Sequence, residues 1–120
     1  MSKTALLIID HGSRKQAANH MLFDMVKLVR YHRPGLLVLG AHMELALPSI
    51  PDGVKRCIQL GATHIIALPY MLSPGRHATR DIPQLITDAL APYPSISFTV
   101  TNALGIDDQL ATLILKRAGL

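Results

Sequence analysis

The alternation of short apolar runs with segments of helical periodicity restricts the possible folds of this 120-residue chain more than any other feature. Strands that alternate with helices are joined by right-handed crossovers, which give a parallel sheet with helices on both faces. The predicted strands are Thr4–Ile9, Leu36–Leu39, His64–Leu68 and Ile96–Val100, and the predicted helices are Arg14–His32, a segment entered at Pro48–Pro51 and ended by Gly61, Asp81–Leu90 and Asp107–Arg117. The sequence therefore predicts one α/β domain over residues 1–120, with a four-stranded parallel sheet in the order βαβαβαβα.

Turn residues and charges mark the ends of the predicted helices. Pro34-Gly35 stops the first helix, and a proline in the first turn opens the second. Ser13 or a neighbouring residue is expected to cap the first helix. The last helix begins with acidic residues and ends with Lys116-Arg117, a charge order that matches the helix macrodipole.

The composition indicates a globular protein with an aliphatic core. Apolar residues make up 49% of the chain and charged residues 17%, and there is no tryptophan. The longest apolar runs are of strand length, so no membrane partner is expected, and the N-terminus has no cleavable signal pattern. The single Cys57 excludes an internal disulfide or a multi-cysteine metal site, and we expect it to be a buried residue on a helix. A reducing cytoplasm is the expected compartment.

The basic residues are dispersed along the chain. The net charge is +4, but no Lys/Arg-rich tail or aromatic platform suggests a nucleic-acid partner. The excess charge would suit a small polyanionic ligand if the basic residues converge in space. Diffuse surface charge is the alternative.

Each predicted strand is followed by an unusual polar cluster. Because ligands bind at the carboxyl ends of the strands in such sheets, we expect the clusters to gather at one edge. They comprise Asp10–Arg14 after the first strand, His42 and Glu44 after the second, Arg76-His77 after the third, and Thr101-Asn102 after the fourth.

His11 and His77 are the strongest candidates for metal ligands at this edge. Neutral imidazole binds iron, cobalt, nickel or zinc, and a carboxylate from Glu44 nearby would give a mixed nitrogen and oxygen site with open positions. Open positions suit a metal that is received and handed on. Either histidine could instead be structural, bonded to a turn carbonyl, and for His42 a packing or hydrogen-bonding role is at least as well supported as a place in the pocket.

Several other chemistries lack their motifs. There is no Gly-x-Gly-x-x-Gly after the first strand and no Walker-type lysine, so no nucleotide cofactor is expected. No Gly-x-Ser-x-Gly elbow supports hydrolase chemistry. The Asp10-His11-Gly12 turn is similar to the Arg-His-Gly turn of histidine phosphatases, but Asp10 stands where an arginine should hold the phosphate. A carboxylate there would repel phosphate, so phosphatase chemistry is rejected.

Three motifs together resemble the short, class II sirohydrochlorin chelatases of the CbiX/SirB type, over about three quarters of the chain. The motifs are Asp10-His11-Gly12-Ser13-Arg14, Met43-Glu44-Leu45-Ala46-Leu47-Pro48-Ser49-Ile50, and Pro69-Tyr70-Met71-Leu72-Ser73-Pro74-Gly75-Arg76-His77 with Asp81-Ile82-Pro83. The resemblance implies a single chelatase-like domain that inserts cobalt or ferrous iron into sirohydrochlorin without ATP, in siroheme or cobalamin biosynthesis. Nickel is the metal of related archaeal enzymes. Leu47 departs from the polar or acidic residue found there in many relatives.

The resemblance also assigns roles to individual residues. It implies that His11 and His77 handle the metal, and that Glu44 is the active-site carboxylate beside them. A basic rim would bind the carboxylates of the substrate. The implied substrate-binding residues are Ser13, Arg14, His42, Ser73, Gly75, Arg76 and Arg80.

Longer relatives hold two such domains that face one another, so a symmetric homodimer that encloses the ring is the expected assembly. Two other interpretations stay open. The chain could be a non-catalytic carrier of metal or tetrapyrrole, or a half-subunit that works only with a partner. It could also be an α/β domain whose histidines are structural.

Overall fold

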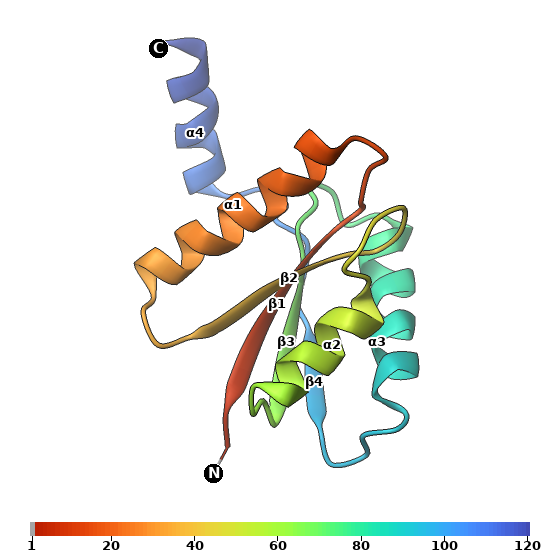
Figure 1. Ribbon diagram of the computed structural model, residues 1–120. Helices are drawn as coiled ribbons and strands as arrows, with labels where there is room; N and C mark the ends of the chain where they lie inside the picture. Colours follow the sequence, from red (N-terminus) through yellow and green to blue (C-terminus); the bar gives the residue numbers. More distant parts are fainter. Residues whose placement is uncertain (1) are drawn as a thin grey trace.

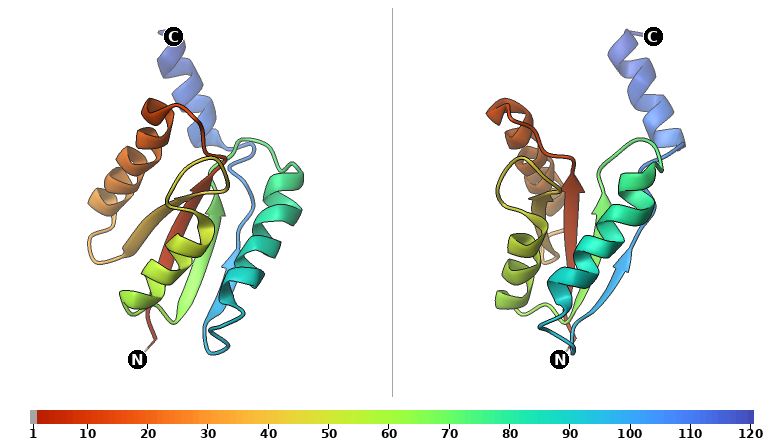
Figure 2. Two further views of the ribbon diagram at one scale, coloured as in Figure 1. Left: turned by 45° about the vertical axis from the view of Figure 1, so that its right-hand side comes forward. Right: turned by 90° about the vertical axis from the view of Figure 1, so that its right-hand side faces the viewer.

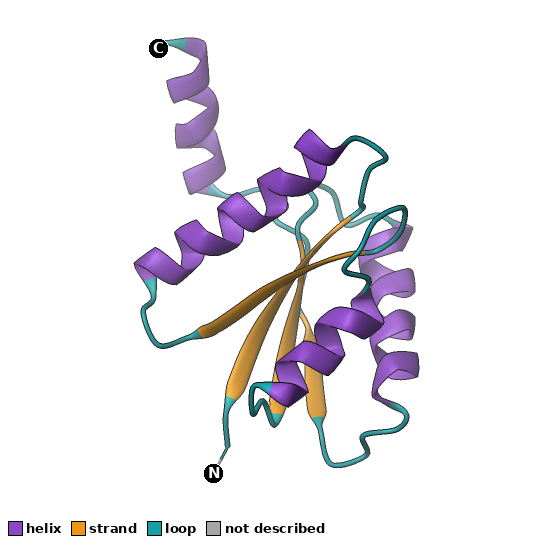
Figure 3. Cartoon of the chain, viewed as in Figure 1, coloured by secondary structure: helices purple, strands orange, loops and turns teal. Residues whose placement is uncertain are grey.

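The structure of the protein is a computed structural model that describes residues 2–120 as four strands, four α-helices and one π-helical turn, η1 (Figures 1 and 3). Their order confirms the predicted alternation. The elements are β1 (Thr4–Asp10), α1 (Gln16–His32), β2 (Leu37–His42), α2 (Ile50–Gln59), β3 (His64–Pro69), η1 (His77–Asp81), α3 (Ile82–Leu90), β4 (Ser97–Val100) and α4 (Asp108–Ala118). Among residues 2–120, no helix is long and apolar enough to cross a membrane.

The four strands form one parallel sheet, as predicted, and their spatial order is β2-β1-β3-β4. Strand β2 is longer than predicted, because Gly40 does not end it and its last residues pair with Ile8–Asp10 of β1. Gly40 lies directly beneath α1, which leaves little room for a side chain at this position. An added Cβ would stand 3.1 Å from a methyl carbon of Val26.

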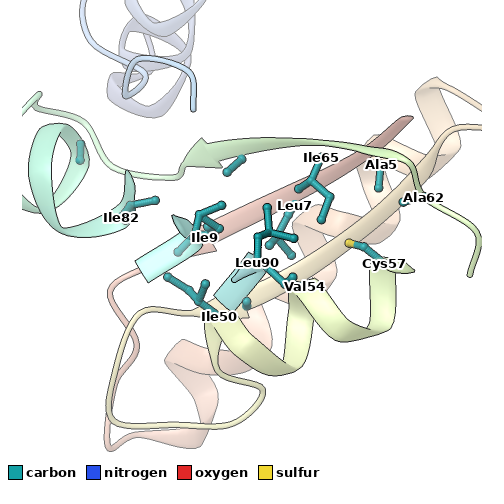
Figure 4. Packing of buried hydrophobic residues seen from close by; sticks show 14 of the residues in the cluster. Ala5, Leu7, Ile9, Ile50, Val54, Cys57, Ala62, Ile65, Ile82 and Leu90 are labelled. Atoms are coloured by element: carbon teal, nitrogen blue, oxygen red, sulfur yellow. The ribbon is translucent and has the colours of Figure 1, made fainter. Parts of the chain in front are cut away.

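Helices cover both faces of the sheet. On one face, Ile8 and Val38 of the sheet pack against Leu22 and Val26 of α1. The opposite face carries the larger core, in which alternate residues of β1 and β3 pack against α2 and α3 (Figure 4). Cys57 of α2 is fully buried in this core, which confirms its predicted place.

The helix starts differ in how they are capped. Ser49 and Asp52 form a capping box at the start of α2, in which each side chain accepts a hydrogen bond from the other's backbone N–H. Helix α1 has Lys15 at its N-cap and no side-chain cap. Ser13 lies two residues earlier, and its hydroxyl accepts a hydrogen bond from the Lys15 N–H. The serine therefore supports the turn before the helix rather than capping it.

Helix α4 stands apart from the sheet (Figure 2). It forms over the predicted segment, and Asp107 caps it by accepting a hydrogen bond from the Gln109 N–H. However, none of its residues is buried. The radius of gyration is 14.7 Å, whereas a compact domain of this length has about 13.6 Å. The three-layer body therefore consists of the sheet and the helices α1, α2 and α3.

Candidate active site

The site predicted at the carboxyl edge of the sheet lies at a topological switch point. From β1 the chain crosses to β2 on one side and later to β3 on the other, so β1 and β3 are neighbours whose following segments diverge. Ligands in open α/β sheets bind at such a point, outside the carboxyl ends of the strands. His11 follows β1, and His77 follows β3 across the loop at residues 70–76. Figure 2 shows both loops at the same edge.

The structure brings His11 and His77 together. Their ring centroids are 5.1 Å apart, and the ring planes are nearly perpendicular, at 88°. Both residues are exposed. Two solvent-accessible imidazoles at this separation can meet an incoming metal ion from two directions, with small side-chain rotations.

Asp81 orients His77. The Nδ1 atom of His77 lies 2.9 Å from the Asp81 carboxylate, with one residue at each end of η1. With a proton on Nδ1 donated to Asp81, the Nε2 lone pair of the neutral ring is free to bind a metal. A carboxylate behind a histidine is the usual support for a metal-binding ring. Sequence reasoning assigned no role to Asp81, although its spacing of four residues from His77 is a detectable signal.

His77 also separates two surface hollows. One is lined by His11, Met71, Leu72, Ser73, Gly75, His77 and Ala78, and the other by Met43, Glu44, His77, Asp81, Gln84 and Leu85. Glu44 thus reaches the second hollow, whereas His11 lines the first. In the part of the chain that is described, no three His, Cys, Asp or Glu side chains form a ready-made metal cluster. The arrangement is the histidine pair His11 and His77, with Asp81 bonded to His77 and with Glu44 in the neighbouring hollow.

Gly12 locks the loop that carries Glu44 against the loop that carries His11. The Met43 N–H donates to the Asp10 carbonyl at 2.9 Å, and the Glu44 N–H donates to the His11 carbonyl at 3.1 Å. Gly12 has φ +86°, and a Cβ on it would stand 1.8 Å from the Glu44 carbonyl oxygen. Only glycine allows the two loops to come this close.

His42 lies beneath the site rather than in it. Its side chain is completely buried, and its Nδ1 lies 2.6 Å from the Asp10 carboxylate. The ring packs edge-on against Phe23, and its Nε2 has no hydrogen-bond partner among residues 2–120. Burial removes the surface that contact with a ligand needs, so the structure favours the hydrogen-bonding role left open above. Asp10, the residue that argued against a phosphatase, is the partner.

The other predicted substrate-binding residues lie around the same edge. Ser73 and Gly75 line the hollow of His11. Arg14, Arg76 and Arg80 are exposed and form no ion pair within residues 2–120. The partly buried Ser13 is fixed by the side chain of Asn19. The Asn19 Oδ1 accepts a hydrogen bond from the Ser13 N–H, and the Asn19 Nδ2 donates one to the Ser13 carbonyl. Of the predicted set, Ser73 and Gly75 thus share a hollow with the histidine pair, whereas His42 lies buried beneath it.

Comparison with known proteins places this arrangement in a family. The family model described as CbiX matches residues 5–119. The chain belongs to the CbiX family. The match extends through the C-terminal quarter, beyond the motifs quoted above.

Individual relatives agree with this assignment. A chloroplastic sirohydrochlorin ferrochelatase from Arabidopsis thaliana is 40% identical over 112 residues, which cover 93% of this chain and 50% of the relative. A sirohydrochlorin cobaltochelatase from Methanocaldococcus jannaschii is 38% identical over 82 residues, which cover 68% of this chain and 57% of the relative.

A solved structure agrees with the fold as well. The sirohydrochlorin chelatase SirB from Bacillus subtilis subspecies spizizenii, in complex with cobalt, is similar with a TM-score of 0.90 and 32% identity. The similarity covers 98% of this chain and 50% of SirB. The chain spans about half the length of three of the curated relatives it matches.

Proposed function

We propose that this chain inserts a divalent metal, cobalt or ferrous iron, into sirohydrochlorin without ATP, as a step towards siroheme or cobalamin. The observation that carries the proposal is the pair His11 and His77 at the switch point, 5.1 Å apart between ring centroids. Relatives named as sirohydrochlorin ferrochelatase and cobaltochelatase support the choice of ring and metals.

Metal insertion sets two chemical demands that these residues can meet. The ion must exchange water for nitrogen ligands that release it again, and two neutral imidazoles hold an ion less firmly than a closed four-ligand site. The ring must lose two pyrrole protons as the metal enters. Glu44, which reaches the hollow beside His77, can accept a proton, and so can either histidine after it releases the ion.

The surrounding residues fit a flat, polyanionic substrate. Arg14, Arg76 and Arg80 are unpaired within residues 2–120 and exposed at this edge, so each is available to a carboxylate at the ring periphery. Sirohydrochlorin carries carboxylates around its whole rim. We therefore assign these arginines to substrate binding, together with Ser73 and Gly75 in the hollow of His11. Nickel is included among the metals because imidazole and carboxylate ligands also suit it.

The decisive experiment is a metallation assay with purified protein. Sirohydrochlorin is mixed with cobalt, ferrous iron or nickel, and the change in its absorption spectrum is followed with and without the chain. We expect faster metallation with the wild type and at least a tenfold loss in His11→Ala and His77→Ala. His32→Ala is the matched control, because this exposed histidine lies at the other end of α1.

Two outcomes would overturn the proposal. No acceleration with any of the three ions would refute catalysis. Tight ring binding without metallation, unchanged in the double variant His11→Ala/His77→Ala, would instead establish a non-catalytic tetrapyrrole carrier.

A further inference from the structure

A groove runs along the outer edge of the sheet beside β2. Strand β2 is the last strand on this side, and α1 and α2 cover its two faces (Figures 1 and 2). The groove lies between the two helices, and residues of α1, β2 and α2 line it. None of them lines the hollows around His11, Glu44 and His77. The groove is therefore separate from the proposed active site.

Gly40 presents an unused backbone donor and acceptor to this groove. Alternate residues of β2 turn their backbone groups away from β1, namely Val38, Gly40 and His42. The Val38 carbonyl accepts hydrogen bonds from the Arg30 guanidinium at 2.9 and 2.5 Å. The His42 N–H donates to the Pro48 carbonyl at 2.8 Å. Between these two positions, the buried Gly40 forms no hydrogen bond on its outer side within residues 2–120, although buried backbone groups are normally paired.

The floor of the groove is apolar and small. It is formed by Phe23, Val26, Leu39 and Pro48. The groove has a volume of about 240 Å³, below the range of about 300–1,000 Å³ for pockets that hold drug-sized ligands. It can therefore take a single apolar side chain but not a whole organic cofactor.

The cations of the groove lie at the end where β2 begins. Arg30 of α1 reaches the Val38 carbonyl there. Helix α2 starts beside the other end of β2, where a β-bridge joins His42 and Ser49, and it runs back along the strand. Arg56 follows about two turns later, which places it about 10 Å back along β2.

Asp52 is the one acidic side chain that lines the groove in the described part of the chain. It lies one turn before Arg56, towards the end of β2, and its carboxylate accepts a hydrogen bond from the Ser49 N–H. Lys27 and Arg56 are exposed, and neither forms an ion pair among the described residues. An anionic group is therefore favoured at the end where β2 begins and disfavoured at the end where it finishes.

We propose that this groove binds an extended segment of a partner protein in which an apolar residue is followed by two acidic residues. The apolar residue exchanges two hydrogen bonds with Gly40, as in an antiparallel strand pair. A Cβ on Gly40 would point towards Val26 of α1. Directly paired residues share a face of the sheet, so the apolar side chain packs against Phe23 and Val26.

The direction of the segment sets the place of its acidic residues. An antiparallel segment runs towards the start of β2, so its next residue lies opposite Leu39 and faces α2, where its carboxylate meets Arg56. The residue after that lies opposite Val38 and faces α1, beside Lys27 and Arg30. Acidic residues placed before the apolar one would instead lie towards Asp52. The order of the residues, as well as their charge, is thus recognised.

Fluorescence anisotropy with synthetic peptides tests the proposal. The probe is a labelled peptide with blocked ends, Gly-Ser-Thr-Leu-Glu-Glu-Ser, in about 0.15 M salt, which screens charges beyond about 8 Å. We expect saturable binding. The peptide Ser-Glu-Glu-Leu-Thr-Ser-Gly has the same composition with the acids before the leucine. A third peptide carries an N-methyl group on the leucine nitrogen, which removes the donor to the Gly40 carbonyl. Each change should weaken binding about fivefold or more, the effect of losing about 1 kcal/mol.

Variants of the protein separate the groove from general surface charge. Arg56→Gln should weaken binding of the probe about fivefold. Lys55→Gln is the matched control, because this exposed cation of α2 does not line the groove, and it should leave binding nearly unchanged. No saturable binding, equal binding of the three peptides, or equal effects of the two substitutions would overturn the proposal.

Amide signals in ¹⁵N NMR spectra locate the bound peptide independently. We expect the Gly40 signal to shift as the probe is added and the signal of Gly75, in the hollow of His11, to stay in place. An unmoved Gly40 signal would refute strand pairing at β2, and a shift at Gly75 alone would place the peptide at the proposed active site instead. Neither experiment uses a metal or a tetrapyrrole, so the peptide groove and the proposed function can fail separately.

Discussion

The contact between Gly12 and the Glu44 loop yields the sharpest prediction of the structure. In Gly12→Ala, the new methyl group would stand 1.8 Å from the Glu44 carbonyl oxygen, whereas a Cβ essentially never comes within 3.0 Å of another heavy atom. The loop must therefore move by more than 1 Å. Such a shift breaks the hydrogen bonds from Met43 to Asp10 and from Glu44 to His11.

The expected loss of stability has two parts. An alanine at φ +86° costs about 1 kcal/mol through the left-handed backbone conformation. The two broken hydrogen bonds cost about 1 kcal/mol each. The free energy of unfolding should therefore fall by about 3 kcal/mol, which lowers Tm by about 12 °C in a domain of this size. Metallation should fall as well, because Glu44 leaves its place beside His77.

Gly35→Ala isolates the steric part. Gly35 has a similar φ of +89°, but nothing lies within 4 Å of its added Cβ. This control should lose only about 1 kcal/mol, and both variants share the same change in the unfolded chain. Urea unfolding measures the two losses. Equal losses would refute the close approach of the two loops.

Three further predictions concern single side chains. Asp81→Asn should weaken metal binding about 10- to 100-fold, measured by titration, because His77 loses the carboxylate that orients it. Asp10→Ala should lower the free energy of unfolding by about 1–3 kcal/mol in urea, because it leaves buried His42 without its hydrogen-bond partner. Cys57 should resist thiol reagents at neutral pH until the chain unfolds, since burial raises the pKa of its thiol to about 11.

Each of these predictions has a control or an opposing result. Asp24→Asn removes an exposed carboxylate of α1 that lines neither hollow of the site, and it should leave metal binding unchanged. Asp24→Ala removes an exposed carboxylate of α1 and should leave stability nearly unchanged. Stability should also fall as the pH rises above 9, the ordinary pKa of the Cys57 thiol, because the unfolded chain then loses that proton first. Rapid labelling of the native thiol at neutral pH would contradict its burial.

The sequence predicted the sheet, its strand direction and the edge at which the site lies, because these follow from the alternation of apolar and helical segments. It did not predict the last part of β2, since Gly40 in an apolar run was interpreted as the end of a strand. The glycine is needed there for contact with Val26 of α1, a tertiary reason that no local pattern reveals. His42 therefore changes from a loop residue into a buried strand residue.

The role of Asp81 was missed for a related reason. Pro74-Gly75 and Pro83 flank the segment and favour a loop, so the spacing between His77 and Asp81 was not interpreted as helical. In the structure these residues form η1, where the Ile82 N–H bonds to the His77 carbonyl across five residues. π-Helical turns are rare in proteins, and those that occur are frequently found at functional sites. Here it places the carboxylate behind the histidine ring.

Helix α4 marks the limit of what periodicity can determine. The pattern of Leu110, Leu113 and Ile114 correctly predicts an amphipathic helix, and its charge order fits the helix direction. The pattern carries no information about what covers the apolar face of this helix. The Leu104 N–H donates to the Met71 carbonyl and the Gly105 N–H to the Leu72 carbonyl, and these bonds hold the chain before the helix to the loop after β3. Two backbone bonds outside any periodic segment therefore fix where the helix starts.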